Sequence, residues 1–210
     1  MFFENRTQAA LLLASHLKQY LGQKPLVLAI PRGGVPLGAV IAKKLCGQLD
    51  VVLVRKLGAP MNPEFAVGAV AESGQFFIAP FAHSAGANDE YLSQEISEQL
   101  ELIHRRRLQY DKVIKSISPA DRVVIVVDDG LATGATMIAA LRSIRQMNPL
   151  KLICAIPVAP SEVVPKLAVY CDEVICLNPS DDFQAVGQFY QYFDQVDDQK
   201  VIELLRESAE

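Results

Sequence analysis

The chain has 210 residues, half of them hydrophobic, and a formal net charge of −4. This length suits a single α/β domain spanning residues 1–210, and the negative charge argues against non-specific nucleic-acid binding, which needs a basic face. No apolar run approaches the roughly 20 residues of a membrane helix, and the first residues lack a secretory pattern. We therefore expect a cytoplasmic protein that makes no membrane contact.

The four cysteines contain no CxxC pair, and the three histidines are scattered along the chain. This pattern favours reduced, mostly buried thiols over a zinc site. We expect no metal bound directly by protein side chains.

The first half of the chain alternates predicted helices and strands. Asn5 or Thr7 can cap a helix that runs to about Leu21, where Gly22 ends it. Pro25–Ile30 is a continuous apolar run, typical of a strand buried on both faces of a parallel sheet. The other expected elements are a helix ending at Leu45, a strand at Asp50–Val54, a loop at Arg55–Pro63, strands at Phe65–Ala71 and Gln75–Ala79, and a helix at Glu90–Lys115.

The second half repeats a strand–turn–helix plan. Its expected elements are a strand at Val123–Val127, a turn at Asp128–Thr136, a helix at Met137–Met147, a strand at Leu152–Pro157, a helix at Glu162–Tyr170, a strand at Glu173–Leu177 and a helix at Asp198–Arg206. Such alternation predicts a doubly wound parallel sheet, whose ligands bind at the carboxyl ends of the strands.

Two adjacent acids stand at the carboxyl end of the strand Val123–Val127. Asp128 and Asp129 suit the vicinal hydroxyls of a ribose, because each carboxylate can accept a hydrogen bond from one hydroxyl. The small residues of Gly130–Thr136 then let a phosphate approach backbone amides at the start of a helix. A Walker loop and a dinucleotide fingerprint both lack required residues here, and the remaining alternative is an ordinary turn with exposed acids.

A second candidate anion site follows the first predicted strand. In Arg32-Gly33-Gly34 the glycines expose backbone amides and the arginine offers a fork for phosphate oxygens. Arg55 and Lys56 also leave a strand, at the start of the expected loop, where a mobile lid could close over a pyrophosphate. The alternative for these two cations is an ordinary strand flank.

The segment Val124–Thr136 resembles the signature of the type I phosphoribosyltransferases: four apolar residues, two acids, an apolar pair and a small-residue phosphate loop. Gly130 departs from the aliphatic residue of most members. Further shared segments resemble an uncharacterised bacterial branch of this family, and the resemblance spans nearly the whole chain. These segments are Asn5-Arg6, Pro31–Pro36, Val54–Gly58 and Phe183–Tyr190.

The resemblance implies a type I phosphoribosyltransferase core, with a small hood built from inserted and terminal segments, that uses 5-phosphoribosyl 1-pyrophosphate. It implies Mg2+ carried mainly by that substrate, a nitrogenous base as acceptor, and a homodimer. The implied catalytic acids are Asp128 and Asp129. The implied ribose and 5′-phosphate site comprises Asp128, Asp129, Gly130, Leu131, Ala132, Thr133, Gly134, Ala135 and Thr136. The implied pyrophosphate contacts are Arg32, Gly33, Gly34, Arg55 and Lys56.

The acceptor stays open at this stage. Ala132 occupies the position where hypoxanthine/guanine-type members carry an aspartate that assists the purine, so a direct copy of their chemistry is disfavoured. Two alternatives to transfer remain: a regulator that binds the sugar or a nucleotide without turnover, and a hydrolase of a phosphorylated ribose.

Three further groups of residues have two interpretations each. Arg105–Arg107 is either a nucleic-acid arm or, as we favour, a solvated helix face. Glu64 and Glu72 are either bases for the acceptor or, as we favour, solvated loop acids. The tail aromatics either stack on an acceptor or, as we favour, pack in the core; they are Phe183, Phe189, Tyr190, Tyr192 and Phe193.

Overall fold

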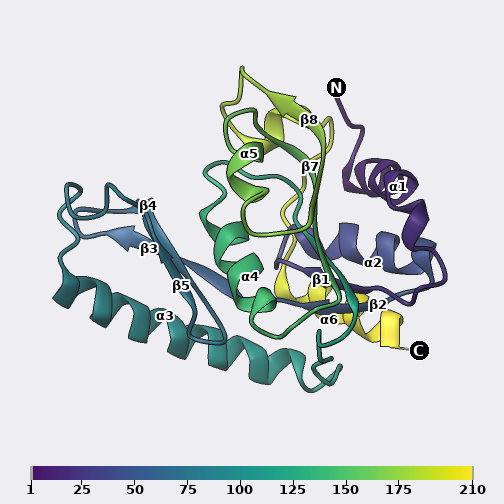
Figure 1. The fold of residues 1–210 in the computed structure, drawn as a ribbon, viewed down its shortest axis with the longest axis horizontal. Helices are drawn as coiled ribbons and strands as arrows, with labels where there is room; N and C mark the ends of the chain where they lie inside the picture. The colour runs from purple at the N-terminus through teal and green to yellow at the C-terminus, as the bar shows by residue number, and fades with distance from the viewer. Residues whose placement is uncertain (1, 210) are drawn as a thin grey trace.

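The computed structural model describes residues 2–209, except for the side chain of Glu64. Its centre is a parallel sheet with the strand order β2-β1-β6-β7-β8 (Figure 1). This sheet confirms the predicted α/β class. The strands are β1 (Leu26–Ala29), β2 (Gln48–Val51), β6 (Val123–Val127), β7 (Lys151–Pro160) and β8 (Glu173–Ser180).

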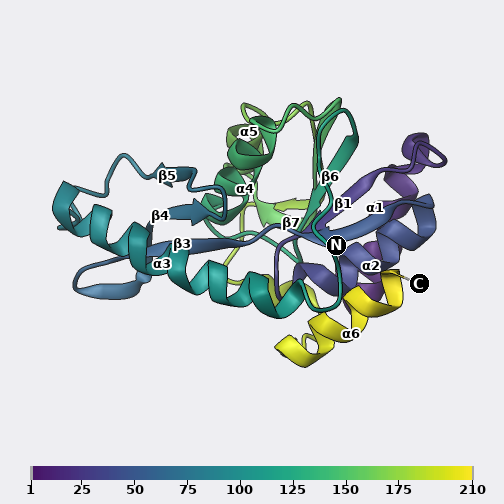
Figure 2. The same cartoon turned by 90° about the horizontal axis from the view of Figure 1, so that it is seen from below.

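Helices cover both faces of the sheet, because alternate side chains of each strand enter two different cores. In β6, Ile125 joins one core while its neighbours Val124 and Val126 join the other. The first core is closed by α1 (Arg6–His16), α2 (Gly34–Leu45) and α6 (Asp198–Ala209), and α6 lies against α2 (Figure 2). The second is closed by α4 (Ala135–Arg145) and the short α5 (Val164–Leu167).

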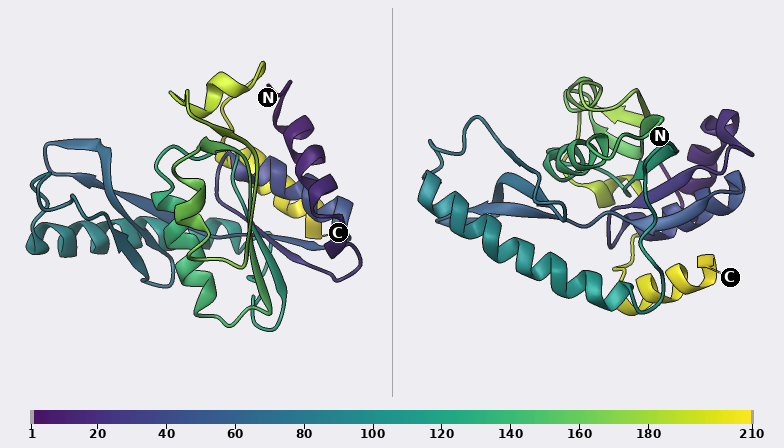
Figure 3. Two further views of the ribbon diagram at one scale, coloured as in Figure 1. Left: turned by 45° about the horizontal axis from the view of Figure 1, so that its top comes forward. Right: turned by 60° about the horizontal axis from the view of Figure 1, so that its bottom comes forward.

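An inserted arm follows β2. Its antiparallel sheet has the order β3-β4-β5, with bounds Val54–Ala59, Asn62–Ala71 and Phe76–Ile78. The sheet lies between α3 (Asp89–Tyr110), which runs along the arm, and α4 of the main body (Figure 3). Across residues 2–209, no helix has both the length and the apolar character needed to cross a membrane.

The expected loop at Arg55–Pro63 is wrong, because most of this segment belongs to β3 and β4, which pair around a two-residue turn. Gly58 and Pro63 suggested a loop, yet they lie where the pairing register shifts. A Cβ at Gly58 would lie 2.6 Å from the carbonyl oxygen of Pro63, so glycine allows the two backbones to approach. Glycine and proline are tolerated in strands at such irregularities.

Strand pairing also extends elements beyond their apolar runs. The strands β7 and β8 stay paired as far as Pro160 and Ser180, past the ends predicted for both. The predicted helix at Glu162–Tyr170 is correspondingly short and is confined to α5. Two 3-10 helices, η1 (Lys18–Tyr20) and η2 (Val186–Phe189), complete the fold.

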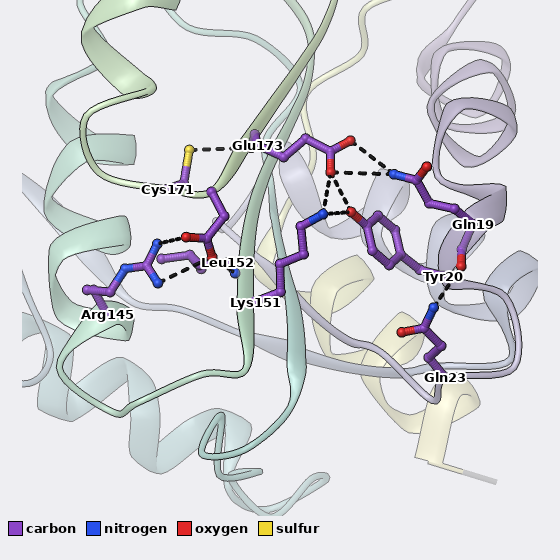
Figure 4. Close-up of polar contacts among 9 residues, drawn as sticks. Gln19, Tyr20, Gln23, Arg145, Lys151, Leu152, Cys171 and Glu173 are labelled. Carbon is purple, nitrogen blue, oxygen red and sulfur yellow. Dashed lines mark hydrogen bonds and ion pairs between the residues drawn. The ribbon is translucent and has the colours of Figure 1, made fainter.

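A polar cluster ties the starts of β7 and β8 to η1 (Figure 4). The Nζ atom of Lys151 lies 2.9 Å from Oε2 of Glu173 and donates to the hydroxyl of Tyr20 at 2.5 Å. The Tyr20 hydroxyl in turn donates to Glu173. Because these groups lie at the amino ends of the strands, they hold the edge of the sheet opposite the carboxyl ends.

Candidate functional site

Two turns that the sequence singled out meet at the carboxyl edge of the sheet. Since β1 and β6 are neighbours, with Ala29 opposite Val127, the turns that follow them are adjacent. A Cβ added to Gly33 would lie 2.0 Å from Oδ2 of Asp129, and one on Gly34 would lie 2.7 Å from the Val127 carbonyl oxygen. The Arg32–Gly34 turn therefore packs directly on the acid pair.

The two acids form a partly buried pair immediately after β6. The amide of Asp129 donates to Oδ1 of Asp128 at 2.9 Å. Burial raises the pKa of Asp128 well above its usual value, and the neighbouring charge of Asp129 raises it further. Burial also raises the pKa of Asp129, although Arg6 opposes this effect. The pair consequently keeps a proton to a higher pH than two isolated carboxyl groups would.

Arg6, the first residue of α1, forms an ion pair with Asp129, although it was not among the predicted site residues. Its Nε and Nη2 atoms lie 2.9 and 2.8 Å from Oδ2 of Asp129. Tyr190, from the other end of the chain, donates its hydroxyl to the Asp129 carbonyl oxygen at 2.7 Å. Segments near both ends of the chain thus contact Asp129, Arg6 at its carboxylate and Tyr190 at its backbone carbonyl oxygen.

A hollow of about 490 Å³ opens above Asp129. Two cations, Arg6 and Arg32, and the backbone of Gly33 line it together with Asp129. The opposite wall comes from the tail, through Val186, Phe193, Asp194, Gln195 and Val196. Arg32 is partly exposed, and its ion pair with Asp198 is long, at 3.8 Å. Such an exposed pair is weak, so the guanidinium is free to meet an anion in the hollow.

The small-residue turn leads into α4 as predicted. Gly134 is its N-cap with φ +77°, in the left-handed region that favours glycine, and a Cβ there would lie 2.8 Å from Cγ1 of Val163. The first amides of the helix have no partner within it, so they can meet an anion. The predicted turn residues Ala135 and Thr136 belong to the first turn of α4, whereas Gly130, Leu131, Ala132 and Thr133 connect it to the acids.

A second hollow, of about 840 Å³, adjoins the phosphate turn at Ala132 and Thr133. It lies between α4, α5 and the arm, and its walls include Phe77, Phe81 and Tyr170. It lacks the two arginines and Asp129 that line the first hollow, but it contains Lys166. The predicted pyrophosphate turn therefore faces the first hollow, whereas the predicted 5′-phosphate turn borders the second.

The structure does not bring Arg55 and Lys56 into either hollow. Arg55 donates to Gln99 and borders Pro31 in a narrow crevice, while Lys56 is exposed on β3. Burial lowers the pKa of Arg55. Arg55 therefore lies beside the Arg32 turn, and Lys56 lines neither hollow.

The charged residues of α3 are used within the chain. Arg107 donates to both carboxylate oxygens of Glu72, at 2.8 and 2.7 Å. Arg105 lies 3.4 Å from Glu101, and Arg106 lies 3.7 Å from Asp198. Arg105 lies on the exposed face of α3, as the solvated-face interpretation predicts. That interpretation is wrong for Arg107, whose side chain is 12% exposed and pairs with Glu72 and Asp50. Glu72 is correspondingly an ion-pair partner rather than a solvated loop acid. The side chain of Glu64 lies outside the described part of the chain.

The tail aromatics divide between core and site. Phe189 and Tyr190 are buried, as the core-packing interpretation predicts. The spacing of four residues between Phe189 and Phe193 would suit one helical face, but η2 ends at Phe189 and Tyr190 is extended, so the two rings do not share such a face. Phe193 instead stacks on Tyr190 at 4.9 Å and lines the hollow, while Tyr192 is exposed. Phe183 stacks on Phe189 at 5.6 Å.

Known proteins resemble this chain over most of its length. The Phosphoribosyl transferase domain family matches residues 5–194. Two Mycobacterium tuberculosis proteins, from strains CDC 1551 and H37Rv and each named "Putative phosphoribosyl transferase", are 38% identical over 97% of this chain. The match covers 46% of their length, so the chain spans about half of these relatives.

Solved structures share the fold. The crystal structure of TT1426 from Thermus thermophilus is 42% identical, covers 99% of both chains and superposes with a TM-score of 0.84. A purine phosphoribosyltransferase from Pyrococcus horikoshii shares the fold, with a TM-score of 0.50 at 13% identity over 91% of this chain and 92% of its own. The chain belongs to the phosphoribosyl transferase domain family.

Proposed function

We propose that this chain transfers phosphoribose from 5-phosphoribosyl 1-pyrophosphate to a nitrogen atom of a purine-like base and releases pyrophosphate. We further propose that residues 1–210 act as one domain. The observation that carries the proposal is the contact between the two turns: Gly33 lies directly against Asp129, with the start of α4 on the same sheet edge. A sugar that carries phosphates at both ends needs two anion sites on either side of a hydroxyl-binding pair.

The roles follow from this arrangement. Asp128 and Asp129 would hold the ribose hydroxyls, and the amides and hydroxyls of Ala132–Thr136 would bind the 5′-phosphate. Arg32 and the amides of Gly33 and Gly34 would hold the pyrophosphate. Arg55 would add positive charge behind this turn, and Lys56 would reach the leaving group only if the arm moves.

The chemistry would be displacement at the anomeric carbon: the bond to pyrophosphate breaks as the bond to the acceptor nitrogen forms. Positive charge develops on the ribose ring and negative charge on the leaving group, so the protein acts mainly by positioning and by electrostatic stabilisation. An anionic carboxylate beneath the ring stabilises the first charge. The Arg32 guanidinium stabilises the second.

Magnesium would arrive on the pyrophosphate. Among the described residues, no cluster of three or more histidine, cysteine or acidic side chains is able to hold a metal ion. The hollow beside Asp129 is wide enough for a hydrated ion carried on the substrate, which suits the way Mg2+ binds with phosphates. Its chemistry when bound would be to neutralise the departing pyrophosphate.

We also propose a homodimer. The positive mean hydropathy (+0.20) and the exposed side chains of Leu11, Leu12 and Leu21 support a buried subunit surface. Sedimentation at two concentrations tests this, and a monomer mass at both would contradict it.

A pyrophosphate-release assay tests the proposed reaction. The protein is incubated with the sugar donor, magnesium and a panel of bases. We expect release only with particular bases; release without any base indicates a hydrolase. Binding of the donor in calorimetry without release indicates a regulator.

The site assignment is tested by the paired change Asp128→Asn and Asp129→Asn, which should abolish donor binding. The matched control is Asp181→Asn with Asp182→Asn, another adjacent pair of acids, which lies in the tail outside the hollow. Unchanged donor affinity in the first pair would refute the site.

A further inference from the structure

The proposed reaction leaves Arg6 without a role, although this residue has the most extensive contacts in the hollow. Asn5 caps α1, its Oδ1 accepting from the Gln8 amide at 3.0 Å, so the first turn of the helix is fixed. Arg6 follows immediately and projects toward Asp129, which is 123 residues away in sequence. The cap therefore fixes the backbone from which the Arg6 side chain extends.

Three neighbours hold the guanidinium group in place. Its Nε and Nη2 atoms both bond Oδ2 of Asp129, and its Nη1 atom donates to the Asp194 carbonyl oxygen at 2.7 Å. The ring of Phe193 covers one face, with its centroid 3.9 Å from the Cζ atom. The side chains of Arg6 and Asp129 are each only 13% exposed. A guanidinium restrained on three sides is suited to a fixed position rather than to a swinging contact.

The Nε donor and the closest ion-pair contact, from Nη2, both involve Oδ2 of Asp129, and Oδ1 takes part in neither. We propose that Arg6 is a positioning residue: it holds Asp129 as an oriented anion whose second oxygen accepts a ribose hydroxyl of the donor. This inference rests on the proposed function. The tail contributes through Phe193 and Asp194, which hold Arg6.

The electrostatic surroundings of Asp129 explain why a cation is needed. Burial raises the pKa of Asp129, and a protonated carboxyl group is a poorer acceptor for a hydroxyl. Arg6 makes the closest compensating contact with Asp129. The titratable and charged groups around this carboxylate, counting the hollow and every packed element, are Arg6, Arg32, Asp128, Tyr190 and Asp194.

The test compares Arg6→Gln with Arg6→Lys, which keeps the charge but loses the fork. The matched control is Arg145→Gln, which breaks the Arg145–Asp172 ion pair (2.9 Å) on the surface (Figure 4). Melting temperatures establish that each variant folds. Donor affinity is then measured by calorimetry between pH 6 and pH 9.

At pH 6 we expect Arg6→Gln to bind the donor about tenfold or more weakly, the loss expected for a charge-assisted bond. The loss should shrink as the pH rises, because a carboxyl group without its cation needs a higher pH to ionise. Arg6→Lys should recover part of the affinity, and Arg145→Gln should match the wild type. A loss of equal size at every pH, or no loss, would overturn the proposal, since a merely structural role does not depend on pH in this way.

A second measurement needs no donor. In protein labelled with ¹³C at the aspartate carboxyl groups, the Asp129 resonance is assigned by its absence in Asp129→Asn. Its titration midpoint should rise in Arg6→Gln and stay unchanged in Arg145→Gln. An unmoved midpoint refutes the inference whether or not the donor binds. If the midpoint rises but the wild type binds no donor, the proposed function fails, and the donor-binding role of Arg6 fails with it.

Discussion

Replacing Gly33 by alanine tests the contact that carries the proposed function. Gly33 has φ −61° and ψ −32°, a conformation open to any residue, so backbone strain does not explain the glycine. Lack of space explains the glycine, because an added Cβ would lie 2.0 Å from Oδ2 of Asp129 and 2.5 Å from its Cγ atom. Carbon and oxygen atoms in ordinary contact are about 3.5 Å apart, so the alanine requires a shift of more than about 1 Å.

The shift must move the anion turn or the acid. Asp129 is held by Arg6 and by Tyr190, so we expect much of the movement in the turn that carries Arg32. A misplacement of about 1 Å costs roughly 100-fold in catalytic rate. The same overpacking should cost about 1–3 kcal/mol of stability.

The assay pairs donor affinity and pyrophosphate release with urea unfolding. Gly74→Ala is the control, since Gly74 lies in the arm at φ +82° with nothing within 4 Å of an added Cβ. That change should cost about 1 kcal/mol of stability through backbone strain and leave donor affinity unchanged. Wild-type binding and release in Gly33→Ala would refute the reasoning, because the contact would then impose no constraint on the site.

Three further predictions follow from single groups. Asp128→Asn should abolish donor binding, yet it should raise the melting temperature at pH 8 more than at pH 4. Burial raises the pKa of Asp128 in the folded protein. The contribution of Asp128 to stability is therefore fully present below the pKa of an ordinary aspartate and is lost as the pH rises through its folded-state pKa. An equal change at both pH values would contradict this. Tyr190→Phe removes the bond to the Asp129 carbonyl oxygen and should cost about 1 kcal/mol in urea unfolding, and an unmoved midpoint would count against that bond. A thiol reagent should modify the exposed Cys46 quickly. Burial raises the pKa of the other three thiols, so their reaction with the reagent should be slow. A thiol that still reacts fast in Cys46→Ser would contradict this prediction.

The sequence by itself determined the elements whose signals are local. Val123–Val127 is apolar at every position because both faces of β6 are buried, and this placed the acids at the carboxyl end of a strand. The small residues up to Gly134 likewise indicated, from local sequence alone, where α4 begins. Once β1 and β6 were expected in one parallel sheet, the turns at their ends had to lie on one edge.

Only the tertiary structure decided which distant residues complete the site. Nothing near Arg6 in the sequence indicates that it meets an acid 123 residues away, because that contact depends on how α1 packs against the sheet and on where the tail returns. The strands on either side of the turn at Pro60 and Met61 form only because each pairs with the other, although glycine and proline there favour a loop. Contacts between segments far apart in the chain have a free energy set by the packed whole, and no local pattern of residues encodes it.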